Sequence, residues 1–218
     1  MIPSFLKRSS SQGRQNEARA GNGPRVPRHS SGWVALLKHL KEDQGLRVLD
    51  IGPTSPTNIN FLTGLGHGIY MADLVREAVA NEWMRPSPEP GGEPEFDVQR
   101  FLSQNMDFGG RQFDVVLLWT SLDYLPEPLI APVIERFREC MLKGGKILAL
   151  FHTKMTGQDT AYCRYHLTDS DQIEVQESEP YPMREVYTNR SIEKLFAGFG
   201  GYKFFLARDN VYEVLITR

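Results

Sequence analysis

The sequence has only two cysteines, Cys140 and Cys163, among its 218 residues. Two distant cysteines match neither a disulfide framework nor a zinc spacing, so we expect reduced thiols, no metal site and a reducing, cytoplasmic compartment. Long apolar runs are also absent, since none approaches the roughly 18 to 20 residues that a membrane helix needs. Residues 1–6 are too short for the apolar stretch of a secretory signal. The sequence therefore predicts a soluble protein without a membrane segment.

Negative charge is scarce in residues 1–30, where six basic residues stand against a single acid, Glu17. The net charge of −2 therefore divides into +5 for this segment and −7 for the remainder. Because the segment is rich in Ser, Gly and Pro and has no apolar periodicity, we predict a disordered basic tail. Contact with nucleic acid or an anionic surface, or an organellar transit peptide, stays open beside a solvated leader. The acidic remainder argues against nucleic acid as a tightly held substrate.

Strand-like and helix-like segments alternate after the tail. Ser31 is the expected cap of a first helix, and residues 46–51 form a short apolar run typical of a buried strand. A second helix is predicted from Ser55, a capping residue followed by proline in the first turn. Residues 69–72 predict the next strand, which ends at Asp73, and a helix over residues 74–84.

The second half of the chain continues the alternation. A short helix is expected over residues 97–103, although a third strand is the competing interpretation of this region. Residues 113–119 and 146–151 predict buried strands on either side of an amphipathic helix over 128–142. Strands alternating with helices predict a parallel sheet with helices on both faces.

The last third of the chain departs from this alternation. Residues 153–188 are polar and contain alternating stretches that predict an inserted hairpin near an acceptor site. A last helix over residues 192–199 and two β runs, at 202–207 and 211–216, close the chain. The two runs flank a turn-like break and are expected to pair with each other.

Four of these segments, in this order, resemble the sequence landmarks of class I S-adenosylmethionine (SAM)-dependent methyltransferases: residues 48–52 (Val-Leu-Asp-Ile-Gly), Asp73, residues 113–116 (Phe-Asp-Val-Val) and residues 142–148. The closing pair of β runs also resembles the terminal antiparallel hairpin of that family. The resemblance covers residues 31–218 and implies a doubly wound α/β domain with a mostly parallel sheet. It also implies SAM as the cofactor.

The resemblance assigns the cofactor site to the ends of the first two strands. An acid that ends the second strand can accept both ribose hydroxyls of a nucleoside, which is the role implied for Asp73. Capping of the following helix is the alternative role for this residue. Gly52 lets the backbone turn beneath the methionine part of the cofactor, and Asp50 bonds either to the loop backbone or, through water, to its ammonium group.

The loop after the first strand differs from the family pattern. Gly52-Pro53-Thr54-Ser55-Pro56 stands where the family has Gly-x-Gly-x-Gly, so two flexible positions are rigid or carry side chains. SAM has no pyrophosphate and does not need a glycine-rich cradle. The hydroxyls of Thr54 and Ser55 are therefore expected to bind its carboxylate. Trp119, at the end of a later strand, is expected to line the crevice.

Methyl transfer from a sulfonium is an in-line displacement, so a general base is needed only for an acceptor that must lose a proton. No residue is clearly assigned to that task, and His152, directly after the 146–151 strand, is the first to test. The predicted function is methyl transfer to an unidentified small-molecule or protein acceptor. A domain that has lost its reaction and serves as a binding or assembly partner is the alternative. A nicotinamide-dependent oxidoreductase is disfavoured because no Gly-x-Gly-x-x-Gly follows Asp50.

Overall fold

The computed structural model describes residues 23–79, 81–155, 160–205 and 209–218. Most of the predicted basic tail, residues 1–22, lies outside the described residues. The remainder of that segment differs from the prediction, because Val26–His29 form strand β1, which pairs antiparallel with β9 (Gln172–Tyr181). Arg28 bonds to Asp209 and Glu213, so acids distant in sequence supply the partners that the local composition lacks. Residues 23–30 therefore belong to the folded domain.

The main sheet has six strands in the described residues. Their order is β10 (Gly201–Phe205), β11 (Val211–Thr217), β7 (Met141–His152), β6 (Phe113–Trp119), β2 (Arg47–Ile51) and β3 (Gly68–Ala72). β7, β6, β2 and β3 are parallel, whereas β11 runs antiparallel to β7 and pairs antiparallel with β10. The predicted mostly parallel sheet with a closing antiparallel hairpin is confirmed.

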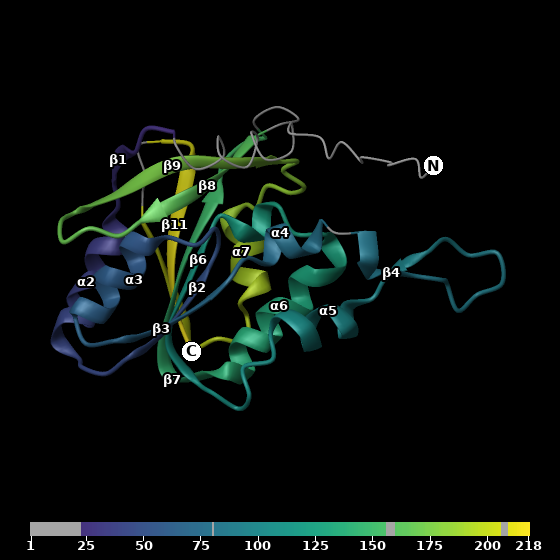
Figure 1. Cartoon of the computed structure of the whole chain (residues 1–218), viewed down its shortest axis with the longest axis horizontal. Helices are drawn as coiled ribbons and strands as arrows, with labels where there is room; N and C mark the ends of the chain where they lie inside the picture. Colours follow the sequence, from purple (N-terminus) through teal and green to yellow (C-terminus); the bar gives the residue numbers. More distant parts are fainter. Residues whose placement is uncertain (1–22, 80, 156–159, 206–208) are drawn as a thin grey trace, which may run out of the picture.

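Helices cover both faces of this sheet (Figure 1). One face carries α2 (Ser31–Glu42) and α3 (Pro56–Gly64). The other carries α4 (Leu74–Ala78), α5 (Val98–Asn105), α6 (Glu127–Cys140) and α7 (Asn189–Leu195). Two 3-10 turns, η1 (Asn81–Trp83) and η2 (Ser121–Asp123), follow α4 and β6. None of the helices within the described ranges is long and apolar enough to cross a bilayer.

Several helix ends differ from the predicted ones. Ser30, rather than Ser31, caps α2, because its hydroxyl accepts a hydrogen bond from the backbone N–H of Trp33 at 3.1 Å. The helix expected over residues 74–84 ends at Ala78 and is followed by the η1 turn. The region of residues 97–103 is helical, as preferred, with Asp97 as the cap of α5.

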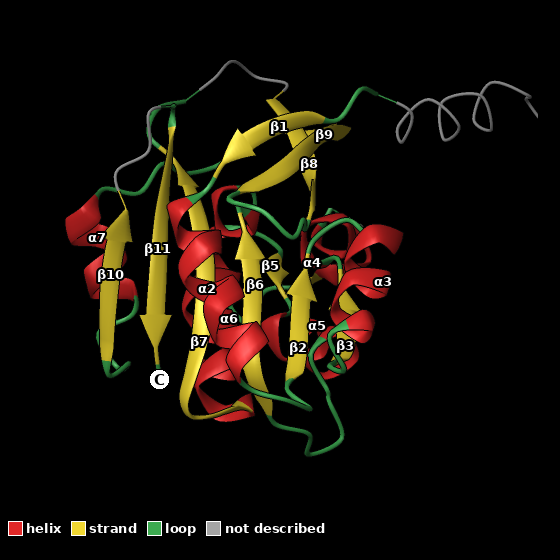
Figure 2. Ribbon diagram, turned by 90° about the vertical axis from the view of Figure 1, so that its left-hand side faces the viewer, coloured by secondary structure: helices red, strands yellow, loops and turns green. Residues whose placement is uncertain are grey.

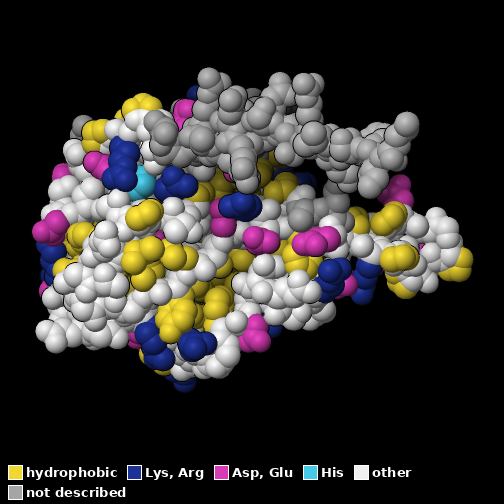
Figure 3. All heavy atoms as spheres, viewed as in Figure 1, with side chains coloured by type: hydrophobic (Ala, Val, Ile, Leu, Met, Phe, Trp, Pro, Cys, Tyr) yellow, Lys and Arg dark blue, Asp and Glu magenta, His cyan; other side chains and the backbone are white. Residues whose placement is uncertain are grey.

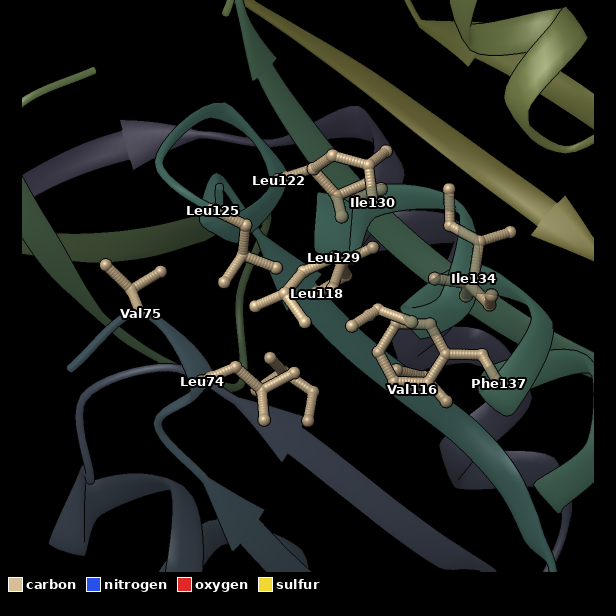
Figure 4. Packing of buried hydrophobic residues seen from close by; sticks show 14 of the residues in the cluster. Leu74, Val75, Val116, Leu118, Leu122, Leu125, Leu129, Ile130, Ile134 and Phe137 are labelled. Carbon is tan, nitrogen blue, oxygen red and sulfur yellow. The ribbon is translucent and has the colours of Figure 1, made fainter. Parts of the chain in front are cut away.

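The core lies in two layers because β6 is buried on both faces. Val115 and Leu117 pack with the cluster beneath α2, whereas Val116 and Leu118 point to the opposite face. Figure 4 shows this second layer, in which side chains of β6 meet those of α6 such as Phe137. Side chains alternate between the two faces of a strand, so an unbroken apolar run supplies both layers.

The predicted insert contributes β8 (Thr160–His166) and β9 to a second, smaller sheet of three strands, in the order β1-β9-β8. β8 and β9 pair antiparallel, which confirms the expected hairpin. A further short hairpin joins β4 (Met84–Arg85) to β5 (Glu95–Phe96) across a proline-rich loop that projects from the body (Figure 1). The small sheet lies beyond the carboxyl ends of β2, β6 and β7 (Figure 2).

Candidate functional site

The carboxyl ends of the parallel strands lie at one end of the main sheet, where the small sheet covers them (Figure 2). In open α/β sheets this end, at the point where the strand order reverses, is where ligands bind. β2 lies between β3 and β6, so the chain reverses direction across the sheet at β2. The geometry of the site therefore depends on the loops that follow β2, β3 and β6.

Asp50, close to the end of β2, is 4% exposed. Its two carboxylate oxygens accept hydrogen bonds from Trp119 Nε1 at 2.7 Å and from Asn58 Nδ2 at 2.9 Å. Burial raises the pKa of Asp50 to about 6, although both hydrogen bonds favour the ionised form. Each oxygen thus has a protein donor, so Asp50 joins the ends of β2 and β6 to the start of α3.

The loop after β2 is also fastened to β8. Asn58 Nδ2 donates a second hydrogen bond to the backbone oxygen of Tyr165 at 3.0 Å, and its Oδ1 accepts one from Leu167 N at 2.8 Å. Ser55 caps α3, since its hydroxyl accepts from Asn58 N at 3.2 Å. The same hydroxyl lies 2.8 Å from Nδ1 of His166. Ser55 is fully buried, so its hydroxyl serves the helix cap and the small sheet.

Gly52 lies against two aromatic side chains. A Cβ at this position would stand 3.2 Å from Trp119 Cδ1 and 3.6 Å from the Tyr162 hydroxyl, which itself bonds to Ser121 Oγ at 2.9 Å. The Trp119 ring stacks on Tyr165 with centroids 4.8 Å apart. Trp119 also has a φ of 46°, a left-handed conformation that is uncommon for a bulky residue and is often found at functional sites. Gly52 therefore makes room for two rings.

Asp73 directly follows β3 and caps α4, because its Oδ1 accepts a hydrogen bond from Arg76 N at 3.2 Å. Burial raises the pKa of Asp73, while that hydrogen bond and the Arg76 charge lower it. Its side chain lines a pocket of about 610 Å³, together with Thr54, Tyr162 and Arg164. The capping role of Asp73 thus leaves the carboxylate beside an open space.

The composition of this pocket suits a zwitterionic ligand. Arg76 and Arg164 contribute positive charge, whereas Asp73, Glu77 and Glu179 contribute negative charge. A ligand that carries both an ammonium and a carboxylate finds an oppositely charged partner for each group. The pocket volume is also within the range of about 300 to 1,000 Å³ that is common for small-molecule and cofactor sites.

His152, the last residue of β7, is held by a buried acid. Asp123, in η2, is 0% exposed, and its Oδ2 accepts hydrogen bonds from His152 N at 2.8 Å and His152 Nδ1 at 2.7 Å. Burial raises the pKa of Asp123, and the bonds from His152 oppose that shift. Asp123 Oδ1 is buried without a hydrogen-bond partner among the described residues. The Tyr124 ring lies 6.0 Å from the imidazole.

A larger pocket, of about 1,050 Å³, lies on the other side of the small sheet. Val26 and Cys163 line it beside the Arg28 ion pairs, and none of the predicted cofactor residues does. Within the part of the chain that the structure describes, no group of three or more His, Cys, Asp or Glu side chains is arranged to hold a metal ion. The pocket beside Asp73 is therefore the one that coincides with the predicted crevice.

The structure separates the predicted cofactor residues into two groups. Thr54 and Asp73 line the pocket. The other four are buried at the strand ends and in the loop beside it: Asp50, Gly52, Ser55 and Trp119. Asp50 does not bond to the loop backbone as expected, because the donors to its two oxygens are the side chains of Trp119 and Asn58.

Sequence reasoning missed two contributors to the site. Asn58, which joins Asp50 to β8, carries no signal beyond a polar residue at an inward-facing helical position. Glu179 on β9 lines the pocket although more than one hundred residues separate it from Asp73. Only the pairing of β8 with β9 above the strand ends brings it there.

An open α/β sheet with a carboxylate after its second parallel strand and a pocket beside it defines the nucleoside-cofactor-binding class of domains. A family model described as a methyltransferase domain matches residues 27–201. That match spans more than half of the chain, so the chain belongs to the methyltransferase-domain family. This confirms the resemblance to the class I SAM-dependent methyltransferases, in which SAM is the methyl donor. The alternative of an inactive binding domain gains no support.

No curated protein matches the chain. Among solved structures, the PH0226 protein of Pyrococcus horikoshii is similar over 99% of this chain and 96% of its own, with 12% identity and a TM-score of 0.51. A SAM-dependent methyltransferase of Methanosarcina mazei is similar over 83% of this chain and 94% of its own, with 15% identity and a TM-score of 0.47. The 1,6-didemethyltoxoflavin-N1-methyltransferase of Burkholderia thailandensis covers 95% of this chain and 82% of its own, with 13% identity and a TM-score of 0.47. Only the likeness to PH0226 has a TM-score above 0.5 and adds support. At an identity of 12% that support concerns the fold alone.

Proposed function

We propose that the chain binds SAM in the pocket beside Asp73 and transfers its methyl group to a small-molecule or protein acceptor. The observation that carries this proposal is the position of Asp73, which directly follows β3 and lines a pocket with the loop after β2. When bound, SAM supplies an electrophilic methyl group on a sulfonium. The protein supplies the alignment of this methyl group with the acceptor.

The side chains around the pocket suggest how each part of the cofactor is held. Asp73 accepts hydrogen bonds from the ribose hydroxyls, as an acid at this position does in nucleoside-binding sheets. Thr54 and the nearby Arg164 serve the carboxylate of the methionine part. Glu179 serves its ammonium. Asp50, with both oxygens engaged, acts indirectly by holding the loop in place.

The rings against Gly52 set the limit of the pocket. Trp119 and Tyr162 leave no open space over this glycine, so we assign the methionine part to the Thr54 side of the loop rather than to the Gly52 face. Ser55 is buried as the cap of α3 and therefore holds the loop in place. This assignment differs from the glycine-loop role expected from the family resemblance.

His152 is the proposed general base for an acceptor that must lose a proton. Its Nδ1 faces the Asp123 carboxylate, so Nδ1 carries the proton and the Nε2 lone pair is available. A buried acid that orients a histidine in this way is the arrangement that makes imidazole an effective base. The test is ¹⁵N NMR of histidine-labelled protein, in which the neutral form of His152 should carry its proton on Nδ1 and have a bare Nε2. The opposite tautomer would refute the assignment.

The cofactor site is tested by isothermal titration calorimetry with SAM and S-adenosylhomocysteine. Asp73→Ser removes the carboxylate but keeps a capping hydroxyl, so α4 retains its cap. Asp97→Ser is the matched control, because Asp97 caps α5 in the same way, by accepting from Arg100 N at 3.1 Å, and lies outside the pocket. We expect micromolar binding to the natural chain and to the control.

For Asp73→Ser we expect at least tenfold weaker binding, because a hydrogen bond to a charged group contributes about 1.5 to 3 kcal/mol. Equal affinities of Asp73→Ser and Asp97→Ser for SAM would show that Asp73 does not contact the cofactor. No heat with the natural chain at high ligand concentration would overturn the proposed cofactor site as a whole.

The two cysteines support a proposal on the compartment. Cys140 and Cys163 are both free thiols. Burial raises the pKa of each to about 11, so neither is an activated thiolate at neutral pH. Unpaired, unreactive thiols are consistent with a reducing, cytoplasmic environment.

A further inference from the structure

β3 forms one edge of the main sheet and, among the described residues, pairs only with β2. Its sequence, Gly-Ile-Tyr-Met-Ala, contains no charge and no proline, and its register with β2 has no bulge. Tyr70 is 36% exposed and Met71 is 40% exposed. Natural edge strands are normally protected by charges, prolines or bulges. The opposite edge strand, β10, carries Lys203.

The hydrogen bonds at the two ends of β3 show which of its backbone groups are already paired. Gly68 N donates to Leu46 O at 2.9 Å, and Ala72 O accepts from Gly52 N at 3.0 Å. Backbone groups of alternate residues point to opposite sides of a strand in the plane of the sheet. The even-numbered residues of β3 therefore direct their N–H and C=O groups to β2.

It follows that Ile69 and Met71 direct their N–H and C=O groups away from β2, to the outer edge. These four groups are two donors and two acceptors, placed symmetrically on either side of Tyr70. A strand with this arrangement is complementary to an antiparallel copy of itself. A twofold axis at Tyr70 brings each donor opposite an acceptor.

We propose that a second copy of this chain pairs antiparallel along the outer edge of β3, about a twofold axis at Tyr70. Ile69 of each copy then faces Met71 of the other in a hydrogen-bonded pair, which forms four backbone hydrogen bonds. Tyr70 faces its counterpart in a non-hydrogen-bonded pair, where Cα atoms lie about 4.5 Å apart and side chains are closest. The two six-stranded sheets become one, and the same surface is used on both copies.

The side chains of β3 agree with this pairing. Ile69 and Met71 lie on one face of the sheet, so apolar groups of the two copies meet there. On the other face the two Tyr70 rings meet, each already held by an edge-on contact with Phe113 at 5.3 Å and by the Arg111 guanidinium at 5.5 Å. Figure 3 views the molecule toward this edge and shows hydrophobic side chains gathered in the middle of the face.

The charges around β3 favour the antiparallel direction. At the amino end of β3, Arg47 lies opposite Gly68 in the register with β2 and forms an ion pair with Asp114. Arg111, which lies over the Tyr70 ring, adds a second positive charge. This end is therefore net positive. The carboxyl end is net negative, because the charged groups of the pocket there are two arginines and three acids: Arg76, Arg164, Asp73, Glu77 and Glu179. Antiparallel pairing sets the positive end of each copy beside the negative end of the other.

The first test is the mass of the full chain in solution, measured by sedimentation equilibrium. We expect the natural chain to be a dimer. Met71→Pro removes one outward N–H and leaves the hydrogen bonds to β2 intact, so the variant should be a folded monomer. Met71→Glu should also be monomeric, because it places a charge in the apolar contact. Tyr202→Glu, at an exposed position of β10, is the matched control and should remain a dimer.

The second test checks the register by disulfide cross-linking in a chain whose two natural cysteines are replaced by serine. Tyr70→Cys should cross-link under mild oxidation, because a residue on the twofold axis lies within disulfide distance of its counterpart. Ile69→Cys alone should not, since it faces Met71 of the other copy. Ile69→Cys combined with Met71→Cys should cross-link again.

A natural chain that stays monomeric up to about 100 µM, a concentration at which even a weak dimer is populated, would overturn the proposal. So would a dimer that survives both Met71→Pro and Met71→Glu, or one that Tyr202→Glu dissociates. Cross-linking through Ile69→Cys alone, without cross-linking through Tyr70→Cys, would refute the register. These outcomes do not depend on SAM, so they are independent of the proposed function.

Discussion

Replacement of Asp50 by asparagine should abolish a specific pH dependence of folding. Burial raises the pKa of this carboxyl from 3.8 to about 6. The folded protein thus binds the proton more tightly than the unfolded chain does. The resulting stabilisation is fully present below pH 3.8 and is lost as the pH rises through 6. Asparagine does not titrate, so the variant lacks this contribution at every pH.

The magnitude follows from the size of the shift. The interval from 3.8 to about 6 corresponds to about 3 kcal/mol over the whole titration. Between about pH 4.5 and about pH 7.5 the change amounts to about 2 kcal/mol. We therefore expect the free energy of unfolding of the natural chain, minus that of Asp50→Asn, to fall by this amount across that range.

The assay is urea unfolding of both chains at several pH values, with Asp107→Asn in an exposed loop as the control. The difference between natural chain and variant cancels the titration of all other groups. If the difference in free energy of unfolding between the natural chain and Asp50→Asn stays constant within about 0.5 kcal/mol across this pH range, the reasoning is refuted. The indole N–H of Trp119, which donates to Asp50 at 2.7 Å, provides a local check. Its NMR shift should titrate with a midpoint near 6 in the natural chain only.

The remaining predictions concern the loop between β2 and α3. Ser55→Ala removes a helix cap and the bond to His166, so it should lower the free energy of unfolding by about 1 to 2 kcal/mol in urea titrations. A loss below about 0.5 kcal/mol would show that this hydroxyl is not needed. Gly52→Ala places a methyl group against Trp119 and Tyr162 and should cost about 1 to 3 kcal/mol by the same assay. An unchanged free energy of unfolding for Gly52→Ala would mean that the two rings move aside easily.

Much of the fold was predictable because it depends on local patterns. The run of residues 113–119 is apolar at both odd and even positions and is short for a helix, as expected of a strand that is buried on two faces. Ser55 followed by proline predicted the start of α3, since the cap and the fixed φ of proline act within one turn. The position of Asp73 directly after β3 was also predictable, because a polar capping residue follows a short apolar run.

The prediction for residues 23–30 failed because their partners are distant in sequence. Val26–His29 have no apolar periodicity, and they become a strand only because β9 offers a free edge. Arg28 is charged and looks solvated in the sequence, yet Asp209 and Glu213 hold it near the start of β11. Neither partner can be inferred from the composition of the segment itself.

The site shows the same division between local and distant causes. The sequence by itself determined which residues stand at the strand ends, because periodicity and capping are properties of neighbouring residues. The tertiary structure decided what each of them does: Asp50 and Ser55 are engaged by other side chains, whereas Thr54 and Asp73 face a pocket. It also decided that β3 is an edge, since strand order depends on which segments pair. Such pairings join residues far apart in the chain, and no local pattern encodes them.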